Sequence, residues 1–242
     1  MLEARGLHKR YAEAVALHPL DLKVEPGEIF ALLGANGAGK TTTIHLFMGF
    51  VEPSGGQALV GGVEVARDPL AAKRRVAYIP ENVMLYGALS GLENLAYFAT
   101  LALGRRPGDA ELAQWLDQAG LARGRGAERV AGYSKGMRQK VGIAIALAKG
   151  AQALLLDEPT SGLDPKAANE FSRLLQQLKA QGVAILMATH DLFLAKQAAD
   201  RVGIMRRGRL LKTMATAELD HVDLERVYLE LQAEDDEAEV AA

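Results

Sequence analysis

The sequence of 242 residues contains no cysteine. This absence excludes disulfide bonds, catalysis by a thiol, and zinc or iron–sulfur centres held by cysteine. It fits a reducing compartment, where disulfides are rare. Stability must then come from a hydrophobic core, and the chain is long enough to bury one.

Long apolar runs and a strong net charge are also missing. No run of apolar residues approaches the roughly 18 that would span a bilayer, and the first residues, MLEARGLHKRYAEA, lack the apolar centre of a signal peptide. The formal net charge is −2, so no overall positive field points to nucleic acid. We therefore expect a cytoplasmic protein with no nucleic-acid partner and no segment inserted directly in the membrane.

Short apolar runs alternate with helical patterns along much of the chain. The runs IFALLG, VAYIP, ALLLDEP and VAILMATH are typical of strands buried on both faces. Helical patterns cover residues 40–50, 165–181 and 192–199, while LDLKV, QALVGG and RVGIMRRGRLLKTM predict further strands. This alternation indicates an α/β fold with a largely parallel sheet.

Residues 85–150 interrupt that alternation. GLENLAYFATLAL and DAELAQWLDQAGL predict helices, a third helix follows Ser134, and no strand is expected between them. We therefore expect a single domain in which residues 1–84 and 151–215 form the core and residues 85–150 form an inserted helical lobe. Residues 216–242 are expected to form a C-terminal helix and an acidic tail, and the composition of that tail predicts disorder.

The segment GANGAGKTT matches the phosphate-binding pattern G-x-x-x-x-G-K-[ST] between a predicted strand and a predicted helix. Small residues let backbone N–H groups face phosphate oxygens. Lys40 adds a charge over the β- and γ-phosphates, and the Thr41 hydroxyl can bind Mg²⁺. A chance match is the alternative, and the strand–loop–helix context disfavours it. The predicted nucleotide-binding residues of this loop are Gly34, Ala35, Asn36, Gly37, Ala38, Gly39, Lys40, Thr41 and Thr42.

Two acidic residues and one histidine follow apolar strands. Asp157 and Glu158 end the strand in LLLDEP, and binding sites of open α/β sheets lie at this end of the strands. We expect Asp157 to hold Mg²⁺ through water and Glu158 to activate the attacking water as a general base. The alternative is a solvated acidic turn before Pro159. His190 ends VAILMATH at the same sheet edge, which favours a γ-phosphate contact over a structural role.

Two further segments carry a possible ligand contact. Tyr11 precedes the phosphate loop, where an aromatic ring can stack on adenine, and a half-buried core position is the alternative. In YSKGMRQK, Ser134 begins a helix, and the N-terminus of such a helix attracts anions. The chain therefore carries a second anion-binding helix end besides its phosphate loop.

The segments GANGAGKTT, YSKGMRQK, LLLDEPTSGLDP and MATH occur in this order. As a set they resemble the Walker A, signature, Walker B with D-loop, and switch-histidine motifs of ATP-binding subunits of ABC transporters. The resemblance covers the chain from Tyr11 to about residue 215. It implies a P-loop NTPase (RecA-like) core with an antiparallel β part and an inserted helical subdomain. It also implies ATP and Mg²⁺ as ligands, and Tyr11 as the ring that stacks on adenine.

The same resemblance implies two protein partners. One is a second ATP-binding subunit, expected as a head-to-tail homodimer that holds two ATP molecules at its interface. There Ser134 and Gly136 would contact the γ-phosphate held by the other subunit, and Asp164 would cross the interface. The other partner is an integral membrane permease, which would contact the helical lobe and place the chain at the inner face of the cell membrane.

This chain departs from the family pattern in two motifs. Glu81, in YIPENVMLY, stands where the family usually has Gln. A carboxylate there can approach Mg²⁺, so Glu81 is a third expected metal ligand beside the phosphate-loop threonine and the strand-end aspartate. In the signature, usually L-S-G-G-Q, the residues that differ are Tyr133, Lys135 and Met137.

These variants resemble those of bacterial exporter-type subunits, including drug and sodium-ion efflux ATPases. We therefore expect an ATPase that powers transport, in the direction of export, through a separate permease. The alternatives are a soluble ABC ATPase of translation or DNA repair, and a regulatory nucleotide-binding module without turnover. A single copy of each motif and the lack of cysteines or long coiled coils disfavour the first, and the presence of Glu158 and His190 disfavours the second.

Overall fold

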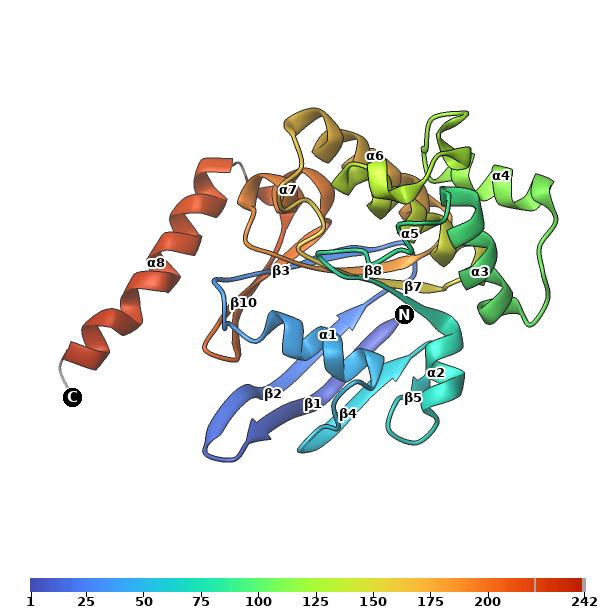
Figure 1. Ribbon diagram of the computed structural model, residues 1–242. Helices are drawn as coiled ribbons and strands as arrows, with labels where there is room; N and C mark the ends of the chain where they lie inside the picture. The colour runs from blue at the N-terminus through green and yellow to red at the C-terminus, as the bar shows by residue number, and fades with distance from the viewer. Residues whose placement is uncertain (220, 241–242) are drawn as a thin grey trace.

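In the computed structural model, which describes residues 1–219 and 221–240, two sheets pack with helices between and around them (Figure 1). The larger sheet has the strand order β10-β9-β3-β8-β7-β6. The strands from β9 to β6 run parallel, and β10 pairs antiparallel with β9 at the edge. The predicted α/β fold with a largely parallel sheet is therefore confirmed. The strands of this sheet are β3 (Ile29–Leu33), β6 (Val76–Ile79), β7 (Ala153–Asp157), β8 (Ala184–Thr189), β9 (Arg201–Arg206) and β10 (Arg209–Ala215).

The central strand β3 shows why its sequence is a continuous apolar run. All five of its side chains are fully buried. Ile29, Ala31 and Leu33 enter the core under the helices of one face, whereas Phe30 and Leu32 enter the core shared with the smaller sheet. Because successive side chains of a strand point to opposite faces, a strand covered on both sides has no polar alternation.

The smaller sheet is antiparallel, with the order β2-β1-β4-β5. Its first strand was not predicted from the sequence. The pairing of β1 shifts register between Ala4 and Leu7, around Gly6, whose φ is +54°. This bulge interrupts the alternation of apolar and polar residues by which a half-buried strand is recognised. The strands are β1 (Leu2–Tyr11), β2 (Ala14–Val24), β4 (Gly55–Val60) and β5 (Val63–Glu64).

Helices form layers on both faces of the larger sheet (Figure 1). Helix α1 lies between the two sheets, and its Ile44 and Phe47 are fully buried there. The helices α3, α4 and α5 gather at one end, and α5 packs against both of the others. No strand forms between β6 and β7 in the part of the chain that is described, as predicted. The helices are α1 (Lys40–Met48), α2 (Pro69–Arg75), α3 (Gly91–Leu103), α4 (Asp109–Gln118), α5 (Lys135–Lys149), α6 (Pro165–Ala180) and α7 (Leu192–Ala198).

The last helix, α8 (His221–Val240), extends from the side of the molecule (Figure 1). Leu224 is fully buried at its start, and Tyr228 packs beside the same core. The acidic segment after residue 232, predicted as disordered, is helical as far as Val240, because Ala and Glu favour helices and no Gly or Pro interrupts them. Residues 220, 241 and 242 of the predicted C-terminal segment lie outside the described residues. Within the described ranges, no helix is both long and apolar enough to cross a bilayer.

Candidate nucleotide site

The phosphate loop joins the end of β3 to the start of α1. Gly37 and Gly39 have φ of +81° and +102°, conformations that favour glycine. A Cβ on Gly39 would also lie only 2.9 Å from the carbonyl oxygen of Ala16. The loop thus needs its small residues to curl as it does. With Glu81, Asp157 and Glu158, residues of the loop and Ala16 line a cavity of ≈ 490 Å³.

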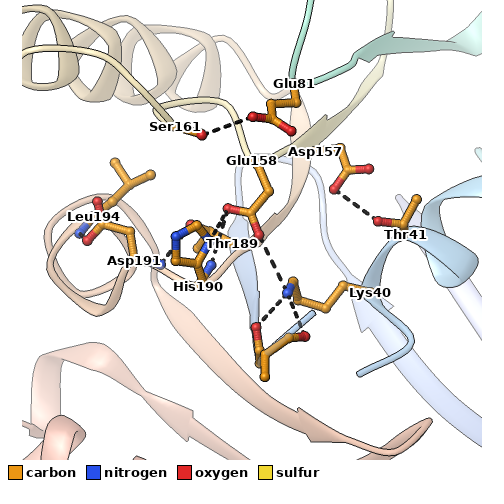
Figure 2. A network of polar contacts seen from close by, with 12 residues as sticks. Lys40, Thr41, Glu81, Asp157, Glu158, Ser161, Thr189, His190, Asp191 and Leu194 are labelled. Carbon is orange, nitrogen blue, oxygen red and sulfur yellow. Dashed lines mark hydrogen bonds and ion pairs between the residues drawn. The ribbon is translucent and has the colours of Figure 1, made fainter. Parts of the chain in front are cut away.

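Lys40 lies within the curl of this loop. Its side chain is 5% exposed, and its ammonium Nζ donates to the carbonyl oxygens of Gly34 and Ala35 at 2.5 and 3.2 Å. The same Nζ lies 3.5 Å from Glu158 Oε1 (Figure 2). A buried ammonium that faces a cavity can bind an anion there.

Asp157 and Thr41 lie side by side in the lining of the cavity. Asp157 is the last residue of β7, and its Oδ1 accepts a hydrogen bond of 3.3 Å from the Thr41 hydroxyl. Burial raises the pKa of the Asp157 carboxyl, the hydrogen bond from Thr41 acts against this, and the charge of Glu158 adds to the rise. A bound cation would remove much of the electrostatic cost of the Asp157 carboxylate.

The two oxygen donors of Asp157 and Thr41 fit Mg²⁺. No cluster of three or more acidic, histidine or cysteine side chains able to hold a metal occurs among the described residues. Mg²⁺ at a nucleotide needs no such cluster, since it takes one or two protein ligands and completes its shell with phosphate oxygens and water. A hydroxyl beside a buried carboxylate at the cavity wall supplies that chemistry.

Glu158 lies between a cation and a histidine. Its φ is +46°, so the backbone turns directly after β7 while its N–H donates to Ala188 O at 2.9 Å. Glu158 Oε2 lies 2.8 Å from His190 Nδ1, and Oε1 faces Lys40 (Figure 2). Oε1 is buried and accepts no hydrogen bond from the described residues. The predicted association of Glu158 and His190 at one sheet edge is thus present in the fold.

Glu81 occupies the edge of the same cavity. Its Oε1 accepts a hydrogen bond of 3.0 Å from the Ser161 hydroxyl and lies 3.4 Å from Lys135 Nζ. The hydrogen bond from Ser161 lowers the pKa of Glu81, and the Lys135 charge acts in the same direction. In Figure 2 the carboxylate of Glu81 points toward Ser161. Ser161 was not predicted as a site residue, because its only signal in the sequence is its place shortly after Asp157 and Glu158.

The signature residues lie apart from the phosphate loop. Ser134, Gly136 and Asp164 line a second cavity, of ≈ 230 Å³, between the starts of α5 and α6. Ser134 Oγ accepts from Met137 N at 3.3 Å, and Asp164 Oδ1 accepts from Ala167 N at 2.9 Å. Each side chain therefore caps its own helix. The fold groups these three predicted residues with each other but not with Lys40 or Glu158.

Tyr11 lies at the end of β1, and its side chain is half exposed, at 46%. Lys9 Nζ lies 4.8 Å from the centroid of its ring. The ring is not part of the lining of the phosphate-loop cavity. The exposed half of Tyr11 can meet a ligand that extends out of the cavity, and the half-buried position that was the alternative also agrees with this exposure.

The chain is similar to known proteins over most of its length. The family described as ABC transporter matches residues 17–161. Over 229 residues the chain is 37% identical to the methionine import ATP-binding protein MetN of Xanthomonas oryzae pv. oryzae, which covers 90% of this chain and 68% of that protein. It is 31% identical over 213 residues to the linearmycin resistance ATP-binding protein LnrL of Bacillus subtilis, covering 87% of this chain and 68% of that protein.

A solved structure agrees at the level of the fold. The structure of an ATP-binding subunit of an ABC transporter matches with a TM-score of 0.82 at 33% identity, and the match covers 96% of this chain and 99% of that one. The family match spans more than half of the chain, and it begins before the phosphate loop and ends after the paired acids. The chain therefore belongs to the ABC transporter family, as one of its ATP-binding subunits, and is an ATPase that powers transport.

Proposed function

We propose that Glu158 is the general base of ATP hydrolysis in this chain. The main support is the position of its carboxylate on the cavity wall, where Oε2 lies 2.8 Å from His190 Nδ1 and Oε1 lies 3.5 Å from Lys40 Nζ. Oε1 is buried and accepts no hydrogen bond from the described residues. A triphosphate in the cavity gives Lys40 phosphate oxygens as new partners. Glu158 is then left to orient the attacking water and take its proton, while His190 contacts the γ-phosphate.

The metal is the second part of the proposed site. When bound, Mg²⁺ would supply positive charge that partly neutralises the phosphates. Thr41 would bind it through its hydroxyl, Asp157 through water, and Glu81 would approach from the cavity edge. The Thr41–Asp157 hydrogen bond at 3.3 Å supports the first two assignments, because it places a neutral and a charged oxygen side by side.

The position of the signature group supports a dimer. Ser134, Gly136 and Asp164 line a cavity of their own, which a nucleotide in the phosphate loop of the same chain does not share. We infer that they act on the ATP of a second, identical subunit in a head-to-tail homodimer, with the N-terminus of α5 facing its γ-phosphate. In the same proposal Tyr11, exposed beside the strand that supplies Ala16, stacks on the adenine of its own ATP.

The permease is the remaining proposed partner. Exposed apolar side chains cluster before and along α3, and grouped exposed apolar residues mark protein contact surfaces. This helix belongs to the proposed helical lobe, residues 85–150, inserted between core segments 1–84 and 151–215. Docking to a permease there would hold the chain at the inner face of the membrane. The exposed residues are Met84, Tyr86, Tyr97, Leu101 and Leu103.

We propose export as the direction of transport. The signature YSKGMRQK and Glu81 resemble exporter-type subunits, and the similar LnrL protein is named for linearmycin resistance. Import is the second candidate, because the similarity to MetN, named for methionine import, is higher at 37% identity.

Directed transport tests these candidates. The chain, purified with its permease, would be placed in liposomes with the ATPase facing outward, and ATP with Mg²⁺ would be added outside. Export predicts ATP-dependent entry of linearmycin into the lumen, whereas loss of preloaded methionine would instead support import. Failure to copurify with any permease, together with full ATPase activity, would favour a soluble ABC ATPase. The Lys40→Ala variant serves as the control without ATP binding.

A further inference from the structure

The phosphate-loop cavity has a surplus of negative charge. Of the described residues that line it, Glu81, Asp157 and Glu158 are carboxylates, and Lys40 is the cation. A nucleotide triphosphate would bring further negative charge to this wall. Mg²⁺ beside Thr41 would compensate Asp157, and the charge of Lys40, 3.5 Å from Glu158, would be shared with the phosphates. Glu81, at the edge, needs a compensating charge from another element.

Lys135 supplies that charge from the first turn of α5. Its Nζ lies 3.4 Å from Glu81 Oε1, and the two side chains are 26% and 47% exposed. The Lys135 side chain extends over the loop that follows β7, and its Cδ and Nζ lie 4.0 Å from the position of a Cβ on Gly162. Ser161, in the same loop, donates to the oxygen of Glu81 that Lys135 faces. The start of α5 and the loop after β7 therefore converge on the carboxylate of Glu81, which lies far from both in the chain.

The position of Lys135 on its helix requires an explanation. It is the first residue of α5, after the cap Ser134. The N-terminus of a helix carries partial positive charge, so a lysine there is disfavoured by the helix itself. A carboxylate 3.4 Å from the ammonium makes a lysine favourable at this position. The ion pair with Glu81 accounts for a lysine at a place where the helix alone would prefer an acid.

We propose that Lys135 is a positioning residue of its own subunit's nucleotide cavity, which holds the Glu81 carboxylate at the cavity edge with its charge balanced. This inference rests on the proposed nucleotide site. Without the ammonium, Glu81 keeps its hydrogen bond from Ser161 at the cavity edge, but its negative charge is no longer balanced and would repel the phosphates. Lys135 thereby acts on nucleotide affinity through Glu81. The rival role is a direct contact between Lys135 and the phosphate of a second subunit.

A double-mutant cycle separates the two roles. The affinity for AMP-PNP with Mg²⁺, a non-hydrolysed probe, would be measured by calorimetry for wild type, Lys135→Gln, Glu81→Gln and the double variant. We expect Lys135→Gln to weaken binding about 2- to 5-fold, the range of a partly exposed ion pair. In the Glu81→Gln background the same substitution should change affinity less than half as much. Lys135→Arg should keep wild-type affinity.

Hydrolysis gives a second readout. Lys135→Gln should raise the KM for ATP and leave kcat near that of the wild type, a split that a general loss of folding would not produce. The matched control is Arg105→Gln, which removes the cation of the Arg105–Glu111 ion pair outside the cavity lining. It should change neither affinity nor KM.

Three outcomes would overturn the inference. Equal loss of affinity from Lys135→Gln in both backgrounds would point to a direct phosphate contact. No loss in either background would show that the ion pair has no role in binding. A fall in kcat with unchanged KM would move the role of Lys135 from binding to the chemical step. Absence of AMP-PNP binding by the wild type would instead contradict the proposed nucleotide site itself.

Discussion

At the scale of single residues, the turn at Glu158 shapes the wall of the phosphate-loop cavity. Consecutive residues of an extended strand point to opposite faces, yet Asp157 and Glu158 both line the cavity. The φ of +46° at Glu158 makes this possible. A non-glycine residue in this region costs on the order of 1–3 kcal/mol and persists where the surroundings fix it. Here the hydrogen bond from Glu158 N to Ala188 O contributes to that restraint.

Asp157 should cost stability to the nucleotide-free chain. Burial raises its pKa in the fold, so the ionised carboxylate opposes folding above its unfolded pKa, and the cost disappears as pH falls through the raised folded pKa. Asp157→Asn should therefore raise the Tm at pH 7 by roughly 2–4 °C, equivalent to about 1 kcal/mol for this length. The difference from the wild type should shrink as pH approaches about 4. Thermal denaturation across this range checks it, and a lower Tm of the variant at pH 7 would count against the argument.

His190 should matter through Glu158. Its Nδ1 is 2.8 Å from Glu158 Oε2, and a hydrogen bond to a charged group contributes about 1.5–3 kcal/mol. His190→Ala should lower kcat by about 10- to 100-fold and weaken ATP affinity much less, by the loss of its γ-phosphate contact. Steady-state kinetics with a binding titration measures both. His8→Ala, in β1 of the smaller sheet, is the control, and equal losses in the two variants would refute a specific role.

At the scale of elements, the starts of α3 and α5 are capped in the same way but lie in different surroundings. Ser90 forms a capping box with Glu93 at the start of α3, and Ser134 caps α5. The two caps satisfy backbone N–H groups in the same way. The start of α5 lies beside the cavity that it shares with Asp164, whereas Ser90 lines neither of the two described cavities of the site. A serine cap therefore lies beside the second cavity in α5 but away from both cavities in α3.

Substitutions at these two caps separate the roles. Ser90→Ala and Ser134→Ala should each lower the free energy of unfolding by about 1 kcal/mol. Ser134→Arg should leave ATP binding to the single subunit intact and block hydrolysis in the assembled dimer, whereas Ser90→Ala should retain hydrolysis. Chemical denaturation, nucleotide titration and ATPase rates provide the three measurements. Loss of ATP binding in Ser134→Arg would argue that the signature acts within its own subunit.

The helices and strands that were predicted correctly are recognisable from a few consecutive residues. The buried strands β3, β7 and β8 are continuous apolar runs, and α6 begins with Asp164 and Pro165, a cap and a favoured first residue. The strand β1 was missed because its bulge at Gly6 breaks the alternation. The short helix α2 was missed because it offers one buried residue, Ala72, and no apolar stripe.

The candidate site was predictable to a similar extent. A short sequence pattern was enough to predict four of the site residues, because each pattern lies within a few consecutive positions. These residues are Lys40, Thr41, Asp157 and Glu158. The contact of Glu81 with Lys135 joins residues 54 positions apart in the chain. No periodicity or spacing links such a pair, so the fold is needed to find it.

At the scale of the whole molecule, the chain carries the two separate halves of the proposed dimer site. One half comprises the phosphate loop, Asp157 and Glu158, and the other comprises Ser134, Gly136 and Asp164. A head-to-tail pair would bring unlike halves together twice, burying two nucleotides by one interface. We therefore infer that ATP joins two copies of this chain.

The measurement that tests this claim most directly is the mass of the Glu158→Gln variant in solution, with and without ATP. The variant should bind ATP, lose at least about 10²-fold in hydrolysis, and therefore keep its nucleotide. Light scattering should give the monomer mass without ATP and twice that mass with it. The control Lys40→Ala/Glu158→Gln should remain monomeric. A Glu158→Gln variant that binds ATP and stays monomeric, or that hydrolyses ATP at the wild-type rate, would contradict the account.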